Sequence, residues 1–517
     1  MDAVPQIATE TPPVTGDTAP SAAGETAPAS RIFWLCFLAC GAATLLPLWL
    51  VEFLPATDLP QHYAQIALWQ QYDAGAGGDV YWLNWFTPYL FGYSLVRLVA
   101  FAVPIEAAFR VVLSAYVIAL PLAMYAWLAA LGRPRELALL AFPAAFGFSF
   151  QWGFFNYTCA LPVALFFLAY GERHLLQPTR RSAAGLALFS VLLFFAHVMI
   201  LAGCGVLLAC RAVVRRGILG GLVALCPAAL GALLVPPWMM LIRANHPAAR
   251  TSAMGWEGWE RLLQLPTRMF GVEGDTWAKA LGIALVAWVL VSFAIARSRE
   301  HTRFLVPAAA LLLYAAMPSW TMDTYFLAQR FAVVFALTLV PALAWPTGRV
   351  ARGVALGLLV LLVAAWDGLQ LSRFRGFDEE ARGLSDVLAK AEPGRSMLGL
   401  MYERESAHIA PSPFLHAPAY YQARKGGVIG FSFAVFFPEL VRFRPGMAPQ
   451  MTPNVEWDPG RFDWNTDGWY QYYLVRTTKA PGARLARAIQ SKRVQLVAQS
   501  GAWSLYENRT AGATRRR

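Results

Sequence analysis

Charge is what this sequence lacks most. Only 14% of its 517 residues are charged, whereas soluble domains carry roughly 25%. The hydrophobic fraction is 57% and the mean hydropathy is +0.45. The apolar residues gather in segments of about 20 residues, the length that crosses a bilayer core of ~30 Å. This composition excludes disorder, a coiled coil and collagen as the main architecture, and it predicts a polytopic α-helical membrane protein.

Cysteine is scarce, and the usual cofactor and nucleotide motifs are missing. The six cysteines lie in apolar stretches without a His or Asp at metal-ligand spacing, so we expect packing residues and no metal site. Residues 372–517 contain no cysteine, so nothing there depends on a disulfide framework. No Gly-rich phosphate loop, Gly-x-Ser-x-Gly elbow or His cluster is present. The net charge is +12, but without a recognised binding motif we expect no nucleic-acid partner.

The apolar runs divide the chain into three parts. Residues 1–30, rich in Ala, Thr and Pro, are predicted to be a disordered leader, without the basic start of a signal peptide. Residues 31–371 are the predicted transmembrane domain, with external loops near 54–86 and 242–278. About eleven spans are expected. They lie near 31–53, 87–104, 108–131, 136–150, 154–170, 183–210, 218–241, 279–296, 304–318, 326–345 and 350–371.

Residues 372–517 differ in composition and are predicted to form a small extramembrane α/β domain. Helical spacing appears at 377–390 and 484–490, and strand patterns appear at 396–402, 469–476, 494–499 and 503–506. This part has an excess of basic residues, which favours anionic partners such as lipid phosphates or marks a solvated end.

The positive-inside rule produces one conflict. It places the Arg-bearing loops at 211–216, 297–303 and 349–352 in the cytoplasm, but the same helix count puts five other arginines outside. The latter are Arg133, Arg135, Arg173, Arg180 and Arg181. Two short crossings within 183–210, separated at His197, would move these loops inside. Another correction nearer to the N-terminus would then be needed.

The segment that follows the first span is the most informative. Asp58 can cap a short helix, with Pro60 in its first turn, and the apolar residues that follow predict a helix lying along the membrane surface. Asp58, His62 and Gln65 share the polar face of this helix. A carboxylate so placed can take a proton from an attacking hydroxyl, with the histidine tuning it or binding a phosphate. The alternative is that Asp58 is only a helix cap.

Other polar residues in apolar surroundings are further candidates. The polar break at 147–157, which contains Asn156, predicts a cavity wall, and His197 is a functional candidate or a neutral core histidine. The loop 242–278 carries Arg243 and His246, which would lie near a donor phosphate or belong to a plain interfacial loop. In the tail, His416 and Tyr420 precede a Gly pair and could hold a sugar acceptor, or pack on the membrane domain.

The segment from Asp58 to Ile66 resembles the first external loop of GT-C superfamily glycosyltransferases, polytopic enzymes that use polyprenyl-phosphate sugars. The resemblance places Asp58 at the position of the catalytic base. A second stretch, 327–331, is similar to the Arg-aromatic start of a late span in bacterial GT-C proteins, and it implies that Arg330 binds the donor phosphate; a snorkelling interfacial Arg is the alternative. The second acidic residue of several GT-C families has no single counterpart, so the resemblance leaves a divalent cation open.

The sequence and the resemblance together predict a membrane glycosyltransferase. Asp58 and His62 are the predicted catalytic residues, and the predicted substrate-binding residues are Gln65, Asn156, Arg243, His246, Arg330, His416 and Tyr420. The expected partners are a polyprenyl-phosphate-linked sugar, a glycan or lipid acceptor and membrane lipids. The expected place is a bacterial inner membrane, with the C-terminal domain extracytoplasmic. The alternative is a non-enzymatic transporter or assembly factor for envelope polysaccharide.

Overall fold

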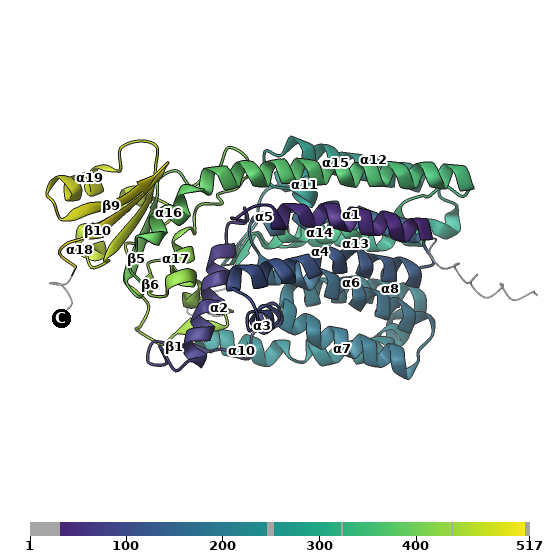
Figure 1. The fold of residues 1–517 in the computed structure, drawn as a ribbon. Helices are drawn as coiled ribbons and strands as arrows, with labels where there is room; N and C mark the ends of the chain where they lie inside the picture. The colour runs from purple at the N-terminus through teal and green to yellow at the C-terminus, as the bar shows by residue number, and fades with distance from the viewer. Residues whose placement is uncertain (1–30, 246–252, 322–323, 437, 512–517) are drawn as a thin grey trace, which may run out of the picture.

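The computed structural model describes residues 31–245, 253–321, 324–436 and 438–511. Long helices lie side by side over most of the molecule (Figure 1). Within the described residues, six helical stretches are long and apolar enough to cross a membrane. They are α1 (Arg31–Trp49), α4 (Ile105–Ala130), α6 (Phe155–Leu176), α8 (Val198–Leu225) through α10 (Val235–Asn245), α12 (Thr276–Ala294), and α15 (Arg349–Ala381) with α16 (Gly383–Ala389). The predicted leader at 1–30 lies outside the described residues.

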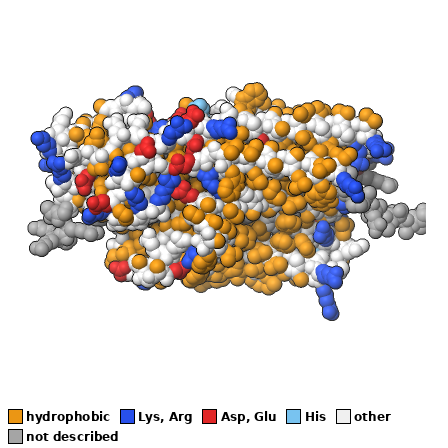
Figure 2. Space-filling view, in the orientation of Figure 1, with side chains coloured by type: hydrophobic (Ala, Val, Ile, Leu, Met, Phe, Trp, Pro, Cys, Tyr) orange, Lys and Arg blue, Asp and Glu red, His pale blue; other side chains and the backbone are white. Residues whose placement is uncertain are grey.

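Shorter helices complete this bundle. They are α7 (Arg180–Ala196), α9 (Ala229–Ala232), α11 (Glu260–Phe270), α13 (Leu305–Ala316) and α14 (Leu327–Leu339). Hydrophobic side chains cover most of the helical part of the surface (Figure 2). Acidic side chains gather over the C-terminal part, and basic side chains lie both there and at the opposite end of the bundle (Figure 2). A surface that exposes so much apolar area is typical of one that faces lipid.

The arginines that conflicted with the helix count lie with the other loop arginines at one end of the bundle, here named the basic end. Arg133 donates to the backbone oxygen of Pro341, and Arg352 pairs with Glu136. Arg211 forms an ion pair with Glu172 at 2.6 Å. These contacts join the segment after α4 to the segment after α14 and to the start of α15, and they join α6 to α8. The placement of five arginines on the side opposite to the other basic loops is therefore wrong.

Two span boundaries explain the error. The run 183–210 is two helices, α7 and the start of α8, because the backbone of His197 is extended between them. The run 87–104 contains only α3 (Leu90–Val99), which packs mainly on α4, α6 and α7 and stays at the end of the bundle opposite to the basic end. It also contacts α2 (Leu59–Asp73), where Arg97 pairs with Asp73 at 2.9 Å. Tyr93 and Val96 of α3 are buried against protein, whereas Leu95 and Leu98 are exposed. The ten residues of α3 extend about 15 Å at ~1.5 Å per residue, which is too short to cross a core of ~30 Å.

The predicted span at 136–150 is not a regular α-helix. It consists of two 3-10 helices, η1 (Arg135–Ala141) and η2 (Pro143–Phe146), and one short turn, α5 (Phe148–Gln151). All of its residues from Leu137 to Gln151 are buried. Protein therefore surrounds this irregular backbone, which satisfies the requirement that non-helical segments at membrane depth avoid lipid.

A five-stranded mixed sheet follows α16 and lies at the other end of the bundle, here named the covered end (Figure 1). Its strand order is β6 (Val428–Ile429), β5 (Ser396–Met401), β8 (Tyr472–Arg476), β10 (Trp503–Asn508), β9 (Val494–Ser500). β5 pairs in parallel with β6 and β8, and β10 pairs antiparallel with β8 and β9. With α19 (Ala483–Gln490), the predicted strands and helix of the tail are confirmed.

Helix α2 lies between the bundle and the C-terminal segment, the part of the described chain that follows α16. Every residue from Leu59 to Trp69 is buried. α17 (Pro418–Lys425) packs on it, and β1 (Tyr81–Leu83), which follows it, pairs antiparallel with β7 (Val441–Phe443). Protein therefore covers this helix, which the sequence predicts to lie along the membrane surface, and the helix runs across the direction of the long bundle helices (Figure 1).

Candidate active site

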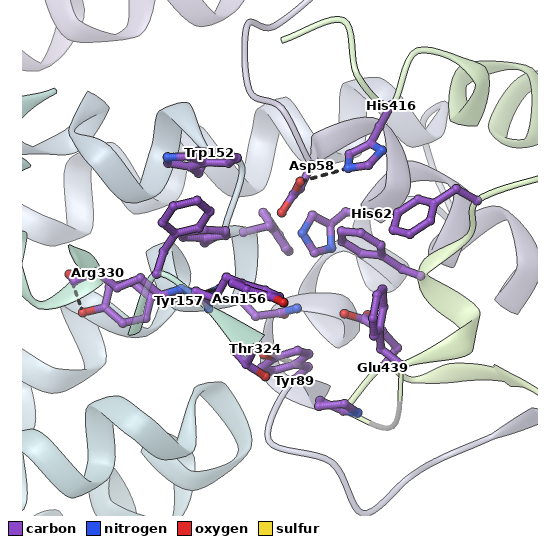
Figure 3. Close-up of a pocket in the computed structure, with 18 of the residues that line it drawn as sticks. Asp58, His62, Tyr89, Trp152, Asn156, Tyr157, Thr324, Arg330, His416 and Glu439 are labelled. Atoms are coloured by element: carbon purple, nitrogen blue, oxygen red, sulfur yellow. Dashed lines mark hydrogen bonds and ion pairs between the residues drawn. The ribbon is translucent and has the colours of Figure 1, made fainter. Parts of the chain in front are cut away.

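A cavity of about 610 Å³ opens at the covered end. Six separate parts of the chain line it: Asp58 with His62, Tyr89, residues from 152 to 157, His197, residues from 324 to 330, and residues from 416 to 457. Polar side chains from several of these parts point into it (Figure 3). Within the described residues it therefore joins the bundle to the C-terminal segment at a site that neither part forms alone.

The backbone around Asp58 is held by the segment 151–153. The N–H groups of Thr57 and Asp58 donate to the oxygens of Gln151 and Trp152 at 3.1 and 3.0 Å. Gly153 has a positive φ of 82°, and a Cβ atom there would lie 2.6 Å from the nitrogen of Asp58. Only glycine combines this conformation with so close an approach. The polar break that the sequence marked at 147–157 therefore positions the predicted base.

Asp58 does not cap α2. Its backbone is helical rather than extended, and its side chain makes no capping hydrogen bond. The carboxylate instead turns toward the cavity, where Oδ1 lies 3.3 Å from Nε2 of His416 (Figure 3). The Asp58 side chain is 16% exposed. The interpretation of Asp58 as only a helix cap is therefore wrong, and its carboxylate is available to a ligand in the cavity.

His62 belongs to a buried chain of hydrogen bonds. Its Nε2 lies 3.0 Å from the oxygen of Gly153, its Nδ1 lies 2.6 Å from the hydroxyl of Tyr93, and that hydroxyl lies 2.5 Å from Oε2 of Glu439. Burial lowers the pKa of His62 to about 4 and raises the pKa of Glu439 to about 8. Both groups are therefore neutral at pH 7, and Glu439 presents a protonated carboxyl group to the cavity.

One arrangement of protons satisfies this chain at neutral pH. The oxygen of Gly153 can only accept, so His62 carries its proton on Nε2 and accepts at Nδ1 from Tyr93. Tyr93 has one proton, so its oxygen accepts from the protonated carboxyl group of Glu439. An ionised Glu439 would take the proton of Tyr93 and leave Nδ1 of a neutral His62 without a donor.

Arg330 and His197 lie on the bundle side of the cavity. Arg330 is 8% exposed, its guanidinium stacks 3.6 Å from the ring centre of Phe154, and Nη2 donates to the oxygen of Tyr325 at 3.0 Å. Its Nε has no hydrogen-bond partner in the described chain. Both ring nitrogens of His197, 4% exposed, likewise have none there. A buried guanidinium and imidazole with unused donors can bind phosphate oxygens of a ligand.

Aromatic rings from the C-terminal segment form the opposite wall. The ring of Phe431 stacks on His416, with centroids 5.0 Å apart and an angle of 8°, and Phe433 and Phe436 pack edge-on around it. Such faces bind the apolar side of a sugar ring, while the nearby carboxyl groups bind its hydroxyls.

The structure brings together five of the nine predicted site residues. Asp58, His62, Asn156, Arg330 and His416 all line the cavity. The other four do not line it in the part of the chain that the structure describes. The side-chain amide of Gln65 donates to the backbone oxygen of Val441 and accepts from its N–H. Tyr420 is buried against Phe53 and Tyr63. Arg243 is exposed on α10, and His246 lies outside the described residues.

The sequence missed two carboxyl groups of the cavity, Glu439 and Glu456. Neither has a sequence signal, because glutamates in a polar tail are usually solvated. The residues considered for a second acid lie elsewhere: Glu106 pairs with Arg424, Glu273 with Arg268 and Asp275 with Arg373, while Asp79 is exposed and Asp323 lies outside the described residues. No three His, Cys, Asp or Glu side chains among the described residues are grouped as a metal ion would require.

No family model matches the chain, and no curated protein matches it in sequence. Its fold is similar to solved structures. ArnT from Cupriavidus metallidurans matches in the apo state with a TM-score of 0.53 and bound to undecaprenyl phosphate with a TM-score of 0.54, both at 12% identity. These matches cover 93% and 92% of this chain and 98% of ArnT.

Arabinofuranosyltransferase AftD from Mycobacteria matches with a TM-score of 0.50 at 16% identity, over 93% of this chain and 42% of AftD. The likeness to ArnT runs through the helical bundle and the C-terminal sheet alike, since it spans nearly all of both chains. With its apolar helices, the chain is a polytopic helical membrane protein. Its fold is that seen in ArnT and AftD.

Proposed function

We propose that this chain is a membrane glycosyltransferase that moves a sugar from a polyprenyl-phosphate donor to an envelope acceptor, either a glycan or a lipid. The observation that carries the proposal is that Asp58 and Arg330, far apart in sequence, face one cavity. The fold supports it, because ArnT shares this fold and its structure was solved with undecaprenyl phosphate bound.

The proposed chemistry needs one base and one anion-binding group. Asp58 accepts the proton of an acceptor hydroxyl, the oxygen bonds to the anomeric carbon, and the bond from that carbon to the phosphate oxygen breaks. The electron pair leaves with polyprenyl phosphate, whose charge Arg330 stabilises through its forked guanidinium. His416, 3.3 Å from Asp58, holds the carboxylate in the cavity. The aromatic wall orients the sugar.

The experiment separates binding from transfer. We expect Asp58→Asn to lower sugar transfer ~10² to 10⁴-fold, the usual contribution of a general base, while undecaprenyl phosphate still raises the melting temperature of the full-length protein. Arg330→Lys keeps the charge but loses the fork, so undecaprenyl phosphate should stabilise it less. Transfer is measured with a panel of polyprenyl-phosphate-linked pentoses and hexoses.

Two exposed residues provide matched controls. Asp79→Asn and Arg487→Lys repeat the same chemical changes at exposed positions that do not line the cavity, and both should behave as the parent. Parental transfer by Asp58→Asn would contradict the role of Asp58 as the base. Stabilisation by undecaprenyl phosphate without transfer of any sugar would favour the transporter or assembly-factor alternative.

We further propose that the cavity faces the extracytoplasmic side of a bacterial inner membrane, because the basic end would then be cytoplasmic by the positive-inside rule. In a variant without the native cysteines, an impermeant maleimide should label Ala76→Cys at the covered end of intact cells and should not label Gly348→Cys at the basic end. Both positions are exposed. The reverse pattern would overturn this orientation.

A further inference from the structure

The basic end contains a second cavity, of about 170 Å³, remote from the candidate active site. The ends of α4 and α14, the part of α8 before its kink at Gly217, and the segment that leads into α13 line it. Four arginines contribute: Arg133, Arg211, Arg215 and Arg303. Trp127, Leu131 and Pro341 give it an apolar side. This cleft has a basic side and an apolar side. It is therefore suited to a ligand that is anionic at one end and apolar at the other.

The arginines outnumber the acids that could neutralise them. Glu172 holds Arg211 at 2.6 Å and Arg215 at 3.3 Å, and Glu300 holds Arg303 at 2.8 Å. Two glutamates therefore pair with three of the four arginines.

Arg133 has no ion-pair partner in the described chain; its guanidinium donates only to the backbone oxygens of Pro341 and Leu343, at 2.9 and 2.6 Å. The Nε of Arg303 is buried and has no hydrogen-bond partner in that part of the chain. Burial and the neighbouring Arg303 lower the pKa of Arg133, which an anion in the cavity would reverse. The cavity thus has both unbalanced charge and an unused donor.

From this geometry we propose that the basic-end cavity binds a phosphate group, carried by an anionic phospholipid or present as free phosphate. Guanidinium groups bind phosphate oxygens through paired hydrogen bonds, which a carbonyl partner does not replace. The apolar side favours the lipid source, since it can contact the first part of the acyl chains. Binding here is independent of the glycosyltransferase proposal, because no cavity residue of the active site takes part.

The test uses the full-length protein in neutral detergent, titrated with phosphatidylglycerol, with phosphatidylcholine or with inorganic phosphate, and followed by native mass spectrometry and melting temperature. Parental protein should bind phosphatidylglycerol more tightly than phosphatidylcholine. The double variant Arg133→Gln, Arg303→Gln should weaken this binding about tenfold or more, since it removes charge-assisted hydrogen bonds. Stabilisation by inorganic phosphate alone, lost in the double variant, would identify free phosphate as the ligand.

The matched control is Arg180→Gln, Arg181→Gln, which removes the same charge from exposed positions at the start of α7. It should bind phosphatidylglycerol within about twofold of the parent. Equal weakening in both double variants would show general attraction to a basic surface and would overturn the proposal. If the Arg133 and Arg303 variant does not fold, Leu131→Trp fills the cavity and keeps all arginines; unchanged binding by Leu131→Trp would also overturn it.

Discussion

The two walls of the active-site cavity are built differently. The helical wall, made of cavity residues up to Arg330, holds its polar groups by backbone geometry: Asp58 is fixed by hydrogen bonds to 151–152 and Arg330 by the first turn of α14. The C-terminal wall, made of cavity residues from His416 onward, holds its groups by side-chain contacts, such as the stack of His416 on Phe431 and the bond of Glu439 to Tyr93. Backbone placement leaves less freedom, so we expect the helical wall to carry the chemistry and the C-terminal wall to adjust it.

Among the substitutions that test this difference between the walls, Gly153→Ala has the largest expected effect on sugar transfer. An added Cβ would lie 2.6 Å from the nitrogen of Asp58 and 2.8 Å from that of Leu59, so the segment 152–153 must move away. Asp58 and His62 would then both lose backbone partners. A displacement of about 1 Å at a reacting group can cost about 10²-fold in rate, and that is the loss of sugar transfer we expect.

Gly75→Ala is the control for that change. Gly75 has a similar positive φ of 80°, but nothing lies within 4 Å of its added Cβ. Alanine at position 75 has the same cost of adopting the left-handed backbone conformation, about 1–2 kcal/mol, but it does not displace a neighbour. If Gly75→Ala and Gly153→Ala lowered transfer equally, backbone strain rather than the placement of Asp58 would be the cause, and the contrast between the walls would fail.

The helical wall was also the more predictable of the two. Asp58 follows the first span directly, and Arg330 opens a late one, so their positions in the hydropathy pattern marked them. The bundle was misassigned at α3, because the apolar run 87–104 forms a helix of only ten residues, too short to cross the bilayer core. Glu439 could not be found this way: its carboxyl group matters only because β7 pairs with β1 and brings it to Tyr93, a contact between residues 346 positions apart.

Gln65 and Tyr420 show the same limit of sequence analysis, because both were predicted to bind substrate and neither is among the described residues that line the cavity. Both have the polar or aromatic character of a binding residue, and the sequence could not reveal that the C-terminal segment folds onto α2. Once it does, Gln65 pairs with the backbone of Val441 and Tyr420 packs between Phe53 and Tyr63. Contacts across such a sequence separation depend on tertiary packing, which local patterns do not encode.

The smallest expected effect tests the C-terminal wall through pH. Glu439→Gln replaces the protonated carboxyl group by an amide that can donate to Tyr93 in the same way, so transfer at pH 7 should be nearly unchanged. The folded pKa of Glu439 is about 8 against an ordinary 4.5. Because the folded protein binds this proton more tightly, the stability that it contributes is present below pH 4.5 and is lost as the pH rises through 8.

The measurement follows melting temperature and sugar transfer between pH 6.5 and 9. His62 does not interfere in this range: its pKa is lowered from 6.5 to about 4, so the stability that it contributes is lost only as the pH falls from 6.5 to 4. Over the measured range ionisation of Glu439 should destabilise the parent by about 2 kcal/mol, and Glu439→Gln should flatten that part of the curve and remove the alkaline loss of transfer. Glu507→Gln, at an exposed position on β10, should keep the parental curve. An unaltered alkaline limb in Glu439→Gln would mean that Glu439 is already ionised at neutral pH, and that the C-terminal wall faces the cavity with a charge rather than a proton.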